Sequence, residues 1–237
     1  MTKTTASPAT RSTMTWRRAL FGINALVALT GLVIGFALTV LGTYPSLNTD
    51  PTMLGNPDQG VLGRIFDYFT YFTIWSNILV AVITAMLFLR PDRDSFVFRV
   101  LRLDSVLMIV VTGIIYNVVL AASAQLQGLE VVSNLFDHVL TPIVSLLVWL
   151  VVGPRGWISL RIIGAALILP IAWLGFALVR GAAMGAYPYG FVDVAKYGYG
   201  TVLLNVLNIV IFAIILCLIL WGIDWAIRRL TQRASTA

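Results

Sequence analysis

The sequence predicts an all-α membrane protein, a bundle of six transmembrane helices with both termini in the cytoplasm. Three observations lead to this fold class. Of the 237 residues, 59% are hydrophobic and only 11% are charged, whereas an average soluble domain carries about 25% charged residues. Six apolar runs have the length of about 20 residues that a helix needs to cross the hydrocarbon core of a bilayer. Basic residues are unevenly divided between alternate loops, which orients the bundle.

The six runs predict helices at residues 19–42, 68–89, 103–124, 135–152, 158–179 and 199–227. Each run is continuous rather than alternating, which excludes the strands of a membrane barrel. The first run is too long for a signal-peptide core and no small-residue cleavage site follows it, so we expect an uncleaved first span. Residues 16–229 then form the transmembrane domain, flanked by a disordered N-terminal tail at 1–15 and a C-terminal tail at 230–237.

The net charge of +6 is explained by topology rather than by a nucleic-acid partner. Thirteen lysines and arginines lie in the termini and the second and fourth loops, and three lie in the other loops. The positive-inside rule then places both termini in the cytoplasm of a multi-pass protein of the plasma (inner) membrane. We expect no nucleic-acid partner.

Polar residues inside the spans indicate where a site lies, because each is costly in a bilayer. In the second span Thr70, Thr73, Asn77 and Thr84 fall within about 60° of one another on a helix. Thr73 lies about six residues, or roughly 9 Å, inside the expected start of that span.

The fourth span carries His138, the single histidine of the chain, after Asp137 and before Pro142. Because proline has no N–H, the carbonyl of His138 loses its helical donor and a bend is expected beside it. His138 lies about 6 Å from the expected start of its helix, at nearly the depth of Thr73. The third and sixth spans add polar groups at this level, namely Tyr116, Asn117, Thr201, Asn205 and Asn208.

The fifth loop reads Tyr187-Pro188-Tyr189 and continues to Asp193. Proline stiffens such a loop, so it is a candidate lid over the outer opening of the bundle, and Tyr187 is a candidate supporting residue.

The other polar residues can also be interpreted as purely structural. A histidine near a helix end can be a satisfied interfacial residue, and threonines in helices commonly bond to their own i−4 carbonyl. The asparagines can serve as interhelical contacts.

Several chemistries are excluded by the composition. One histidine and one cysteine, Cys217, cannot build an ordinary structural zinc site or an intrachain disulfide. No phosphate-binding loop, dinucleotide fingerprint or nucleophile elbow is present. We therefore expect neither a metal nor a cofactor.

Three blocks of the sequence resemble those of a known family: Tyr71-Phe-Thr73-Ile-Trp-Ser76-Asn77, His138-x-x-x-Pro142 and Tyr187-Pro188-Tyr189. Over residues 16–229 the chain resembles bacterial six-helix membrane proteins, which are similar to the animal androgen-induced and androgen-dependent six-transmembrane proteins. The animal proteins are threonine hydrolases of fatty acid esters of hydroxy fatty acids. The resemblance implies that Thr73 is the nucleophile and His138 the catalytic histidine. The His-to-Pro spacing is one residue shorter here and Ser76-Asn77 lacks a clear counterpart, so the animal substrate is not carried over.

The chemistry is physically reasonable, because a threonine hydroxyl becomes nucleophilic when a neighbouring base takes its proton. His138 can do so within about 3 Å. Asp137 or Asp193 could orient the imidazole, and Asn77 or Asn117 could donate to an oxyanion.

We expect an intramembrane lipid-ester hydrolase near the outer leaflet, whose partner is a membrane lipid or amphiphilic ester. The alternatives are a non-catalytic carrier or lipid- or small-molecule-binding membrane protein, and a structural membrane subunit. The sequence leaves the oligomeric state open.

Overall fold

The computed structural model describes residues 8–43, 52–55 and 60–234, and these residues are helical apart from their connecting turns and loops. Six helices are long and apolar enough to cross a membrane, as the sequence predicted. They cover Thr15–Leu41, Phe72–Leu89, Phe96–Ser123, Leu129–Val152, Leu160–Met184 and Val194–Arg233. The protein is therefore an all-α, multi-pass membrane protein.

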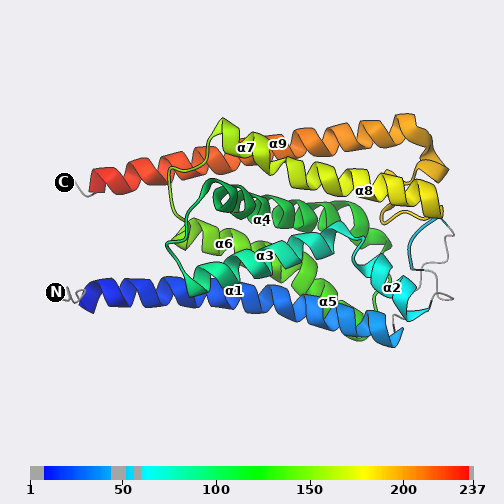
Figure 1. The fold of residues 1–237 in the computed structure, drawn as a ribbon, viewed down its shortest axis with the longest axis horizontal. Helices are drawn as coiled ribbons and strands as arrows, with labels where there is room; N and C mark the ends of the chain where they lie inside the picture. Colours follow the sequence, from blue (N-terminus) through cyan, green and yellow to red (C-terminus); the bar gives the residue numbers. More distant parts are fainter. Residues whose placement is uncertain (1–7, 44–51, 56–59, 235–237) are drawn as a thin grey trace.

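Several spans are built from more than one element. The elements, in chain order, are α1 (Pro8–Leu41), α2 (Val61–Tyr68), α3 (Phe72–Leu89), α4 (Phe96–Ile115), η1 (Tyr116–Leu120), η2 (Ala121–Ser123), α5 (Leu129–Leu135), η3 (Phe136–Leu140), α6 (Thr141–Val152), α7 (Leu160–Ala166), α8 (Ile168–Met184), η4 (Gly190–Val192) and α9 (Val194–Ala234). The third span is thus α4–η1–η2, the fourth α5–η3–α6 and the fifth α7–α8. Helix α1 begins and α9 ends at the same end of the bundle (Figure 1). We call this the terminal end, and the opposite end the distal end.

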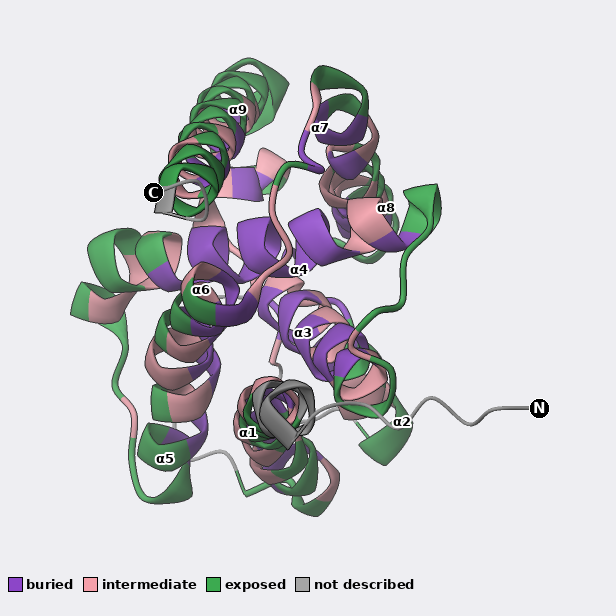
Figure 2. Cartoon of the chain, turned by 90° about the vertical axis from the view of Figure 1, so that its left-hand side faces the viewer, coloured by how far each residue is buried: buried purple, intermediate pink, exposed green. Residues whose placement is uncertain are grey.

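Helix α4 is the centre of the bundle. It is the most buried helix in Figure 2, and its residues from Arg102 to Gly113 are all buried. It contacts α3, α6, α7 and α9. The main apolar core forms around it, with Leu103, Leu107 and Ile109 almost fully buried. Helix α9 contacts α4, α8 and η4 and is the least buried of the six spans.

The second span differs most from its predicted form. The sequence predicted one helix from residue 68, but α2 ends at Tyr68 and α3 begins at Phe72. Contacts from α8 stabilise the break: the indole of Trp173 donates to the Thr70 carbonyl over 2.9 Å, and buried Arg180 pairs with buried Asp67. The local sequence does not show this break because its partners lie about 100 residues further along the chain.

Other helix ends extend beyond the apolar runs. The fourth span begins at Leu129 rather than at residue 135, because Glu130 and Ser133 are buried inside the bundle and do not end the helix. Helix α1 begins at Pro8, within the segment predicted to be a disordered tail, where proline is well tolerated in the first turn. Residues 1–7 of that tail lie outside the described residues. At the other terminus α9 continues to Ala234, and 235–237 lie outside the described residues.

Two loops join at the distal end. The N–H of Leu54 donates to the Tyr187 carbonyl over 3.0 Å, and the N–H of Tyr187 donates to the Thr52 carbonyl over 2.8 Å. The Thr52 hydroxyl donates to Asp193 over 2.6 Å. These contacts fix the loop after α8 against the loop before α2, so both cover the distal end of the bundle.

Candidate functional site

Thr73 lies at the start of α3, immediately after the break in the second span. Its Oγ1 atom is 3.1 Å from Nε2 of His138, although 65 residues separate the two in sequence. Thr70 and Thr84, also of the predicted polar stripe, bond to the carbonyls four residues earlier. For Thr73 that carbonyl belongs to Phe69, and the indole of Trp75 donates to it. The Thr73 hydroxyl is directed instead to the histidine.

His138 lies in η3, a single π-helical turn between α5 and α6. The carbonyl of His138, which Pro142 leaves without a helical donor, accepts a hydrogen bond from the Asn117 amide over 3.0 Å. The carbonyl that the sequence predicted to lack a helical donor is therefore bonded to a side chain of the third span. The ring of His138 stacks on Tyr116, with centroids 3.9 Å apart and planes at 26°.

Tyr116 itself begins η1, a second π-helical turn. Such turns are rare and occur frequently at functional sites, because they displace one residue from the regular helix. Here two such turns lie on neighbouring spans, with His138 from one stacked on Tyr116 from the other. The stacking leaves Nε2 directed at Thr73. Two irregular turns thus hold the imidazole.

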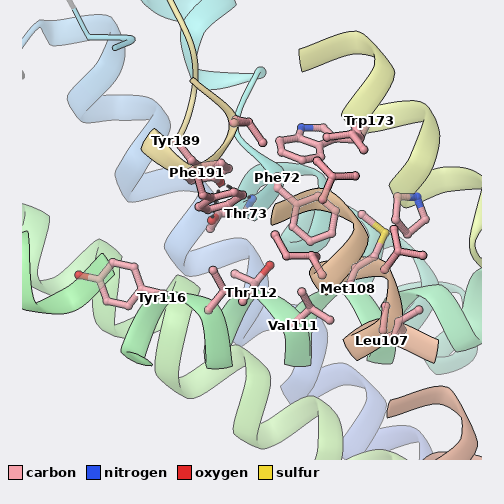
Figure 3. A pocket seen from close by; sticks show the side chains of 18 of the residues that line it. Phe72, Thr73, Leu107, Met108, Val111, Thr112, Tyr116, Trp173, Tyr189 and Phe191 are labelled. Atoms are coloured by element: carbon pink, nitrogen blue, oxygen red, sulfur yellow. Dashed lines mark hydrogen bonds between the residues drawn. The ribbon is translucent and has the colours of Figure 1, made fainter. Parts of the chain in front are cut away.

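Tyr189 completes the cluster from the loop after α8. Its hydroxyl oxygen accepts a hydrogen bond from the Thr73 N–H and also lies 3.3 Å from Thr73 Oγ1. Stacking on Phe191, with planes at 6°, holds the Tyr189 ring. Burial raises the pKa of Tyr189 above its ordinary value, so the hydroxyl keeps its proton. Figure 3 shows Thr73 beside Tyr189 and Phe191.

Two cavities meet at this cluster. The apolar cavity, about 870 Å³ with part of that volume open to the surroundings, extends between α4, α8 and α9. The polar cavity, about 1460 Å³ and also partly open, lies towards the distal end and is lined by charged groups including Asp67 and Glu130. The residues that line both cavities are Thr73, Tyr116, Leu120, His138 and Tyr189. The threonine and the histidine thus separate an apolar compartment from a polar one.

The two asparagines predicted to stabilise an oxyanion use their amide donors elsewhere. Asn77 donates to the carbonyls of Thr73 and Asp137, at 2.9 and 3.3 Å. Asn117 donates to the carbonyls of Gly113 and His138, at 2.8 and 3.0 Å. Both amides hold backbone segments around the site in place, as the structural reading of asparagine suggested.

The two carboxylates predicted to orient the histidine also lie elsewhere. Asp137 packs against Gly31 of α1 and accepts a hydrogen bond from Ser133 over 3.2 Å. Asp193 is fully buried at the start of α9, where it accepts from the Lys196 N–H over 3.0 Å. The Nδ1 atom of His138 is buried and makes no hydrogen bond of ordinary geometry. The backbone of Asn134, one turn earlier, also interacts with the imidazole ring.

Tyr187 was predicted as a supporting residue, but its neighbour Tyr189 reaches the site. The Tyr187 ring packs against Gly181 of α8, where an added Cβ would lie 2.0 Å from the ring. The Tyr-Pro-Tyr turn has no regular side-chain period, so the sequence does not indicate which of the two rings reaches the site. The Asp67–Arg180 pair and Trp173 were also missed, because their roles depend on contacts between distant helices.

Comparisons with protein-family models, with curated proteins and with solved structures find no match to this chain. Among the described residues, no group of three or more His, Cys, Asp or Glu side chains is placed to hold a metal ion.

Proposed function

We propose that the protein is an intramembrane hydrolase of lipid esters, with Thr73 as nucleophile and His138 as general base. The observation that carries the proposal is the 3.1 Å separation of Thr73 Oγ1 and His138 Nε2 at the junction of the apolar and polar cavities. A hydroxyl and an imidazole at hydrogen-bonding distance are the minimum set for nucleophilic acyl transfer. The resemblance to threonine hydrolases adds to this argument.

The proposed reaction has two steps, acylation of Thr73 and hydrolysis of the resulting threonyl ester. Thr73 Oγ1 attacks the ester carbonyl while its proton moves to Nε2 of His138, and a tetrahedral oxyanion forms. The carbon–oxygen bond to the alcohol then breaks, and the alcohol leaves with the proton from the imidazolium. In the second step His138 takes a proton from a water molecule, which attacks the threonyl ester. The acid is released and the proton returns to Thr73.

Tyr189 is the oxyanion donor in this proposal. Its hydroxyl accepts from the Thr73 N–H and retains its own proton to donate. Thr73 is the second residue of α3, and the positive end of the helix dipole favours a developing negative charge there. Tyr189 thus takes the role that the sequence assigned to Asn77 or Asn117.

The proposal places the distal end at the outer face of the plasma membrane and both termini in the cytoplasm. The uneven division of basic residues between the loops supports this orientation. The site then lies close to the outer interface. There the polar cavity admits water and the apolar cavity lies at the depth of the acyl chains.

The two alternative functions have less support. A structural subunit needs polar groups packed against one another, whereas Thr73 and His138 line two cavities. A carrier needs a route to both faces. The apolar cavity ends near the middle of the bundle at Leu107 and Ala213, and the residues lining a third cavity, nearer the terminal end, are shared with neither of the other two.

Ester hydrolysis by the purified full-length protein in nanodiscs tests the proposal. We expect wild type to hydrolyse a monoacylglycerol, Thr73→Ala to lose the activity, and Thr73→Ser to retain part of it because serine keeps the hydroxyl. His138→Ala should lose the acylation step as well. Hydrolysis by Thr73→Ala at the wild-type rate, or no hydrolysis of any acyl ester by folded wild type, would refute the proposal.

A further inference from the structure

We infer that the apolar cavity binds the acyl chain of the ester, and that this chain enters sideways from the bilayer between α8 and α9. The polar cavity receives the alcohol and the water. This inference rests on the proposed function and extends it, because it assigns the two halves of the substrate to the two cavities and gives the lipid a route to Thr73.

The lining of the apolar cavity matches a hydrocarbon chain. Its walls are almost wholly aliphatic and aromatic, and include Met108, Val111, Leu174, Val206 and Val210. The polar residues of the lining lie mainly at one end, where Thr73, His138 and Tyr189 meet. Thr112 is a polar residue further along, and its hydroxyl lies 2.9 Å from that of Ser76. A chain whose carbonyl lies at Thr73 therefore meets apolar side chains along its length.

Two walls of this cavity, α8 and α9, belong to the two least buried spans of the bundle. Helices α8 and α9 lie above α4 in Figure 2 and contact each other, and α9 is the least buried span. Ile171 of α8 lines the cavity and is 50% exposed, so the lining reaches the lipid-facing surface. All these residues lie within the spans. The opening of the cavity therefore faces lipid, and a lipid tail is the occupant that matches the apolar lining of the cavity.

The polar cavity is unsuited to the same chain. Its lining includes Arg64, Asp67, Glu130 and Asp137, all of them charged or ionisable. Moving an acyl chain past such groups would remove their hydration without replacing it. Hydroxyl groups of an alcohol and water can bond to them instead. The Tyr189 ring, fixed between Trp173 and Phe191, stands at the boundary of the two cavities.

Bulky substitutions in the two walls test the route. Val210→Trp in α9 and Ile171→Trp in α8 each fill the apolar cavity from a different helix. Ile215→Trp is the matched control, because Ile215 is 49% exposed on α9 and does not line the cavity. Each variant is reconstituted in nanodiscs and given two esters of one alcohol, mono-oleoylglycerol in the membrane and water-soluble monobutyrylglycerol. Size-exclusion chromatography checks that each variant is folded.

We expect both wall variants to lower oleoyl hydrolysis by roughly tenfold or more, because overpacking excludes the chain. Butyryl hydrolysis should stay close to wild type, and Ile215→Trp should change neither rate. Wild-type oleoyl rates in folded wall variants would overturn the inference and leave the proposed hydrolase intact. An equal loss with both esters would also overturn it, since the block would then act on Thr73 itself. Hydrolysis of neither ester by wild type would refute the proposed function and the inference with it.

Discussion

Gly113 in α4 allows the third and fourth spans to approach closely enough to place His138. A Cβ added at Gly113 would lie 2.8 Å from Cβ of Pro142, 2.9 Å from its Cγ and 3.3 Å from the carbonyl oxygen of His138. Carbon atoms in contact are ordinarily about 3.5–4.0 Å apart. Gly113→Ala must therefore move Pro142, at the start of α6, away from α4 by about 0.7 Å or more, and the adjoining η3 moves with it. A displacement approaching 1 Å at a reacting group costs about a hundredfold in rate.

The assay for Gly113→Ala is the rate of ester hydrolysis in nanodiscs, with thermal stability followed by size-exclusion chromatography. We expect hydrolysis to fall by about ten- to a hundredfold, with a stability loss of about 1–3 kcal/mol from overpacking. Gly175→Ala in α8 is the matched control, since no atom lies within 4 Å of an added Cβ there. Its rate should equal that of wild type. A folded Gly113→Ala protein with the wild-type rate would refute the view that this close approach positions His138.

Three further predictions concern the surroundings of Thr73. Tyr189→Phe should lower kcat by about a hundredfold with little change in KM, as the loss of an oxyanion donor does; an unchanged kcat would assign Tyr189 to packing alone. Burial raises the pKa of Tyr189 above its ordinary 10.0, so the neutral hydroxyl donor persists as pH rises. We therefore expect kcat not to fall with rising pH below pH 10.0, and a fall below that pH would contradict the role of Tyr189 as the donor. Arg180→Met should destabilise the protein by about 3–5 kcal/mol, because Asp67 remains buried without its partner, and Asp67→Leu added to it should restore part of the melting temperature. A melting temperature equal to wild type for the single variant would contradict this.

Hydropathy was enough to predict the spans, because each helix must be apolar over the same length to cross a bilayer. It misplaced their ends wherever polar residues are buried inside the bundle. Leu129 to Asn134 were excluded from the fourth span, yet Ser133 donates to Asp137 and Glu130 is buried. The break before Thr73 depends on Trp173 and Arg180, which only the packed structure brings to it.

The meeting of Thr73 and His138 was predicted from similar depths, although both depths were measured from incorrect helix starts. Thr73 is the second residue of α3, and His138 is the tenth residue of the span that begins at Leu129. Both incorrect starts lie at the distal ends of the helices, where α5 extends the fourth span and a break interrupts the second span. The side chains still lie level with each other. What the sequence could not supply is Tyr189, because a turn in a loop carries no period that fixes its inward face.

The covalent adduct of a fluorophosphonate tests the central claim most directly. We expect the probe to label wild type in nanodiscs, with the added mass located on Thr73 in a tandem mass spectrum of the peptide containing residues 71–77. Thr73→Ala, folded by size-exclusion chromatography, should carry no label, and His138→Ala should label far more slowly. An adduct on another residue, or equal labelling of Thr73→Ala and wild type, would contradict the assignment of Thr73 as the nucleophile.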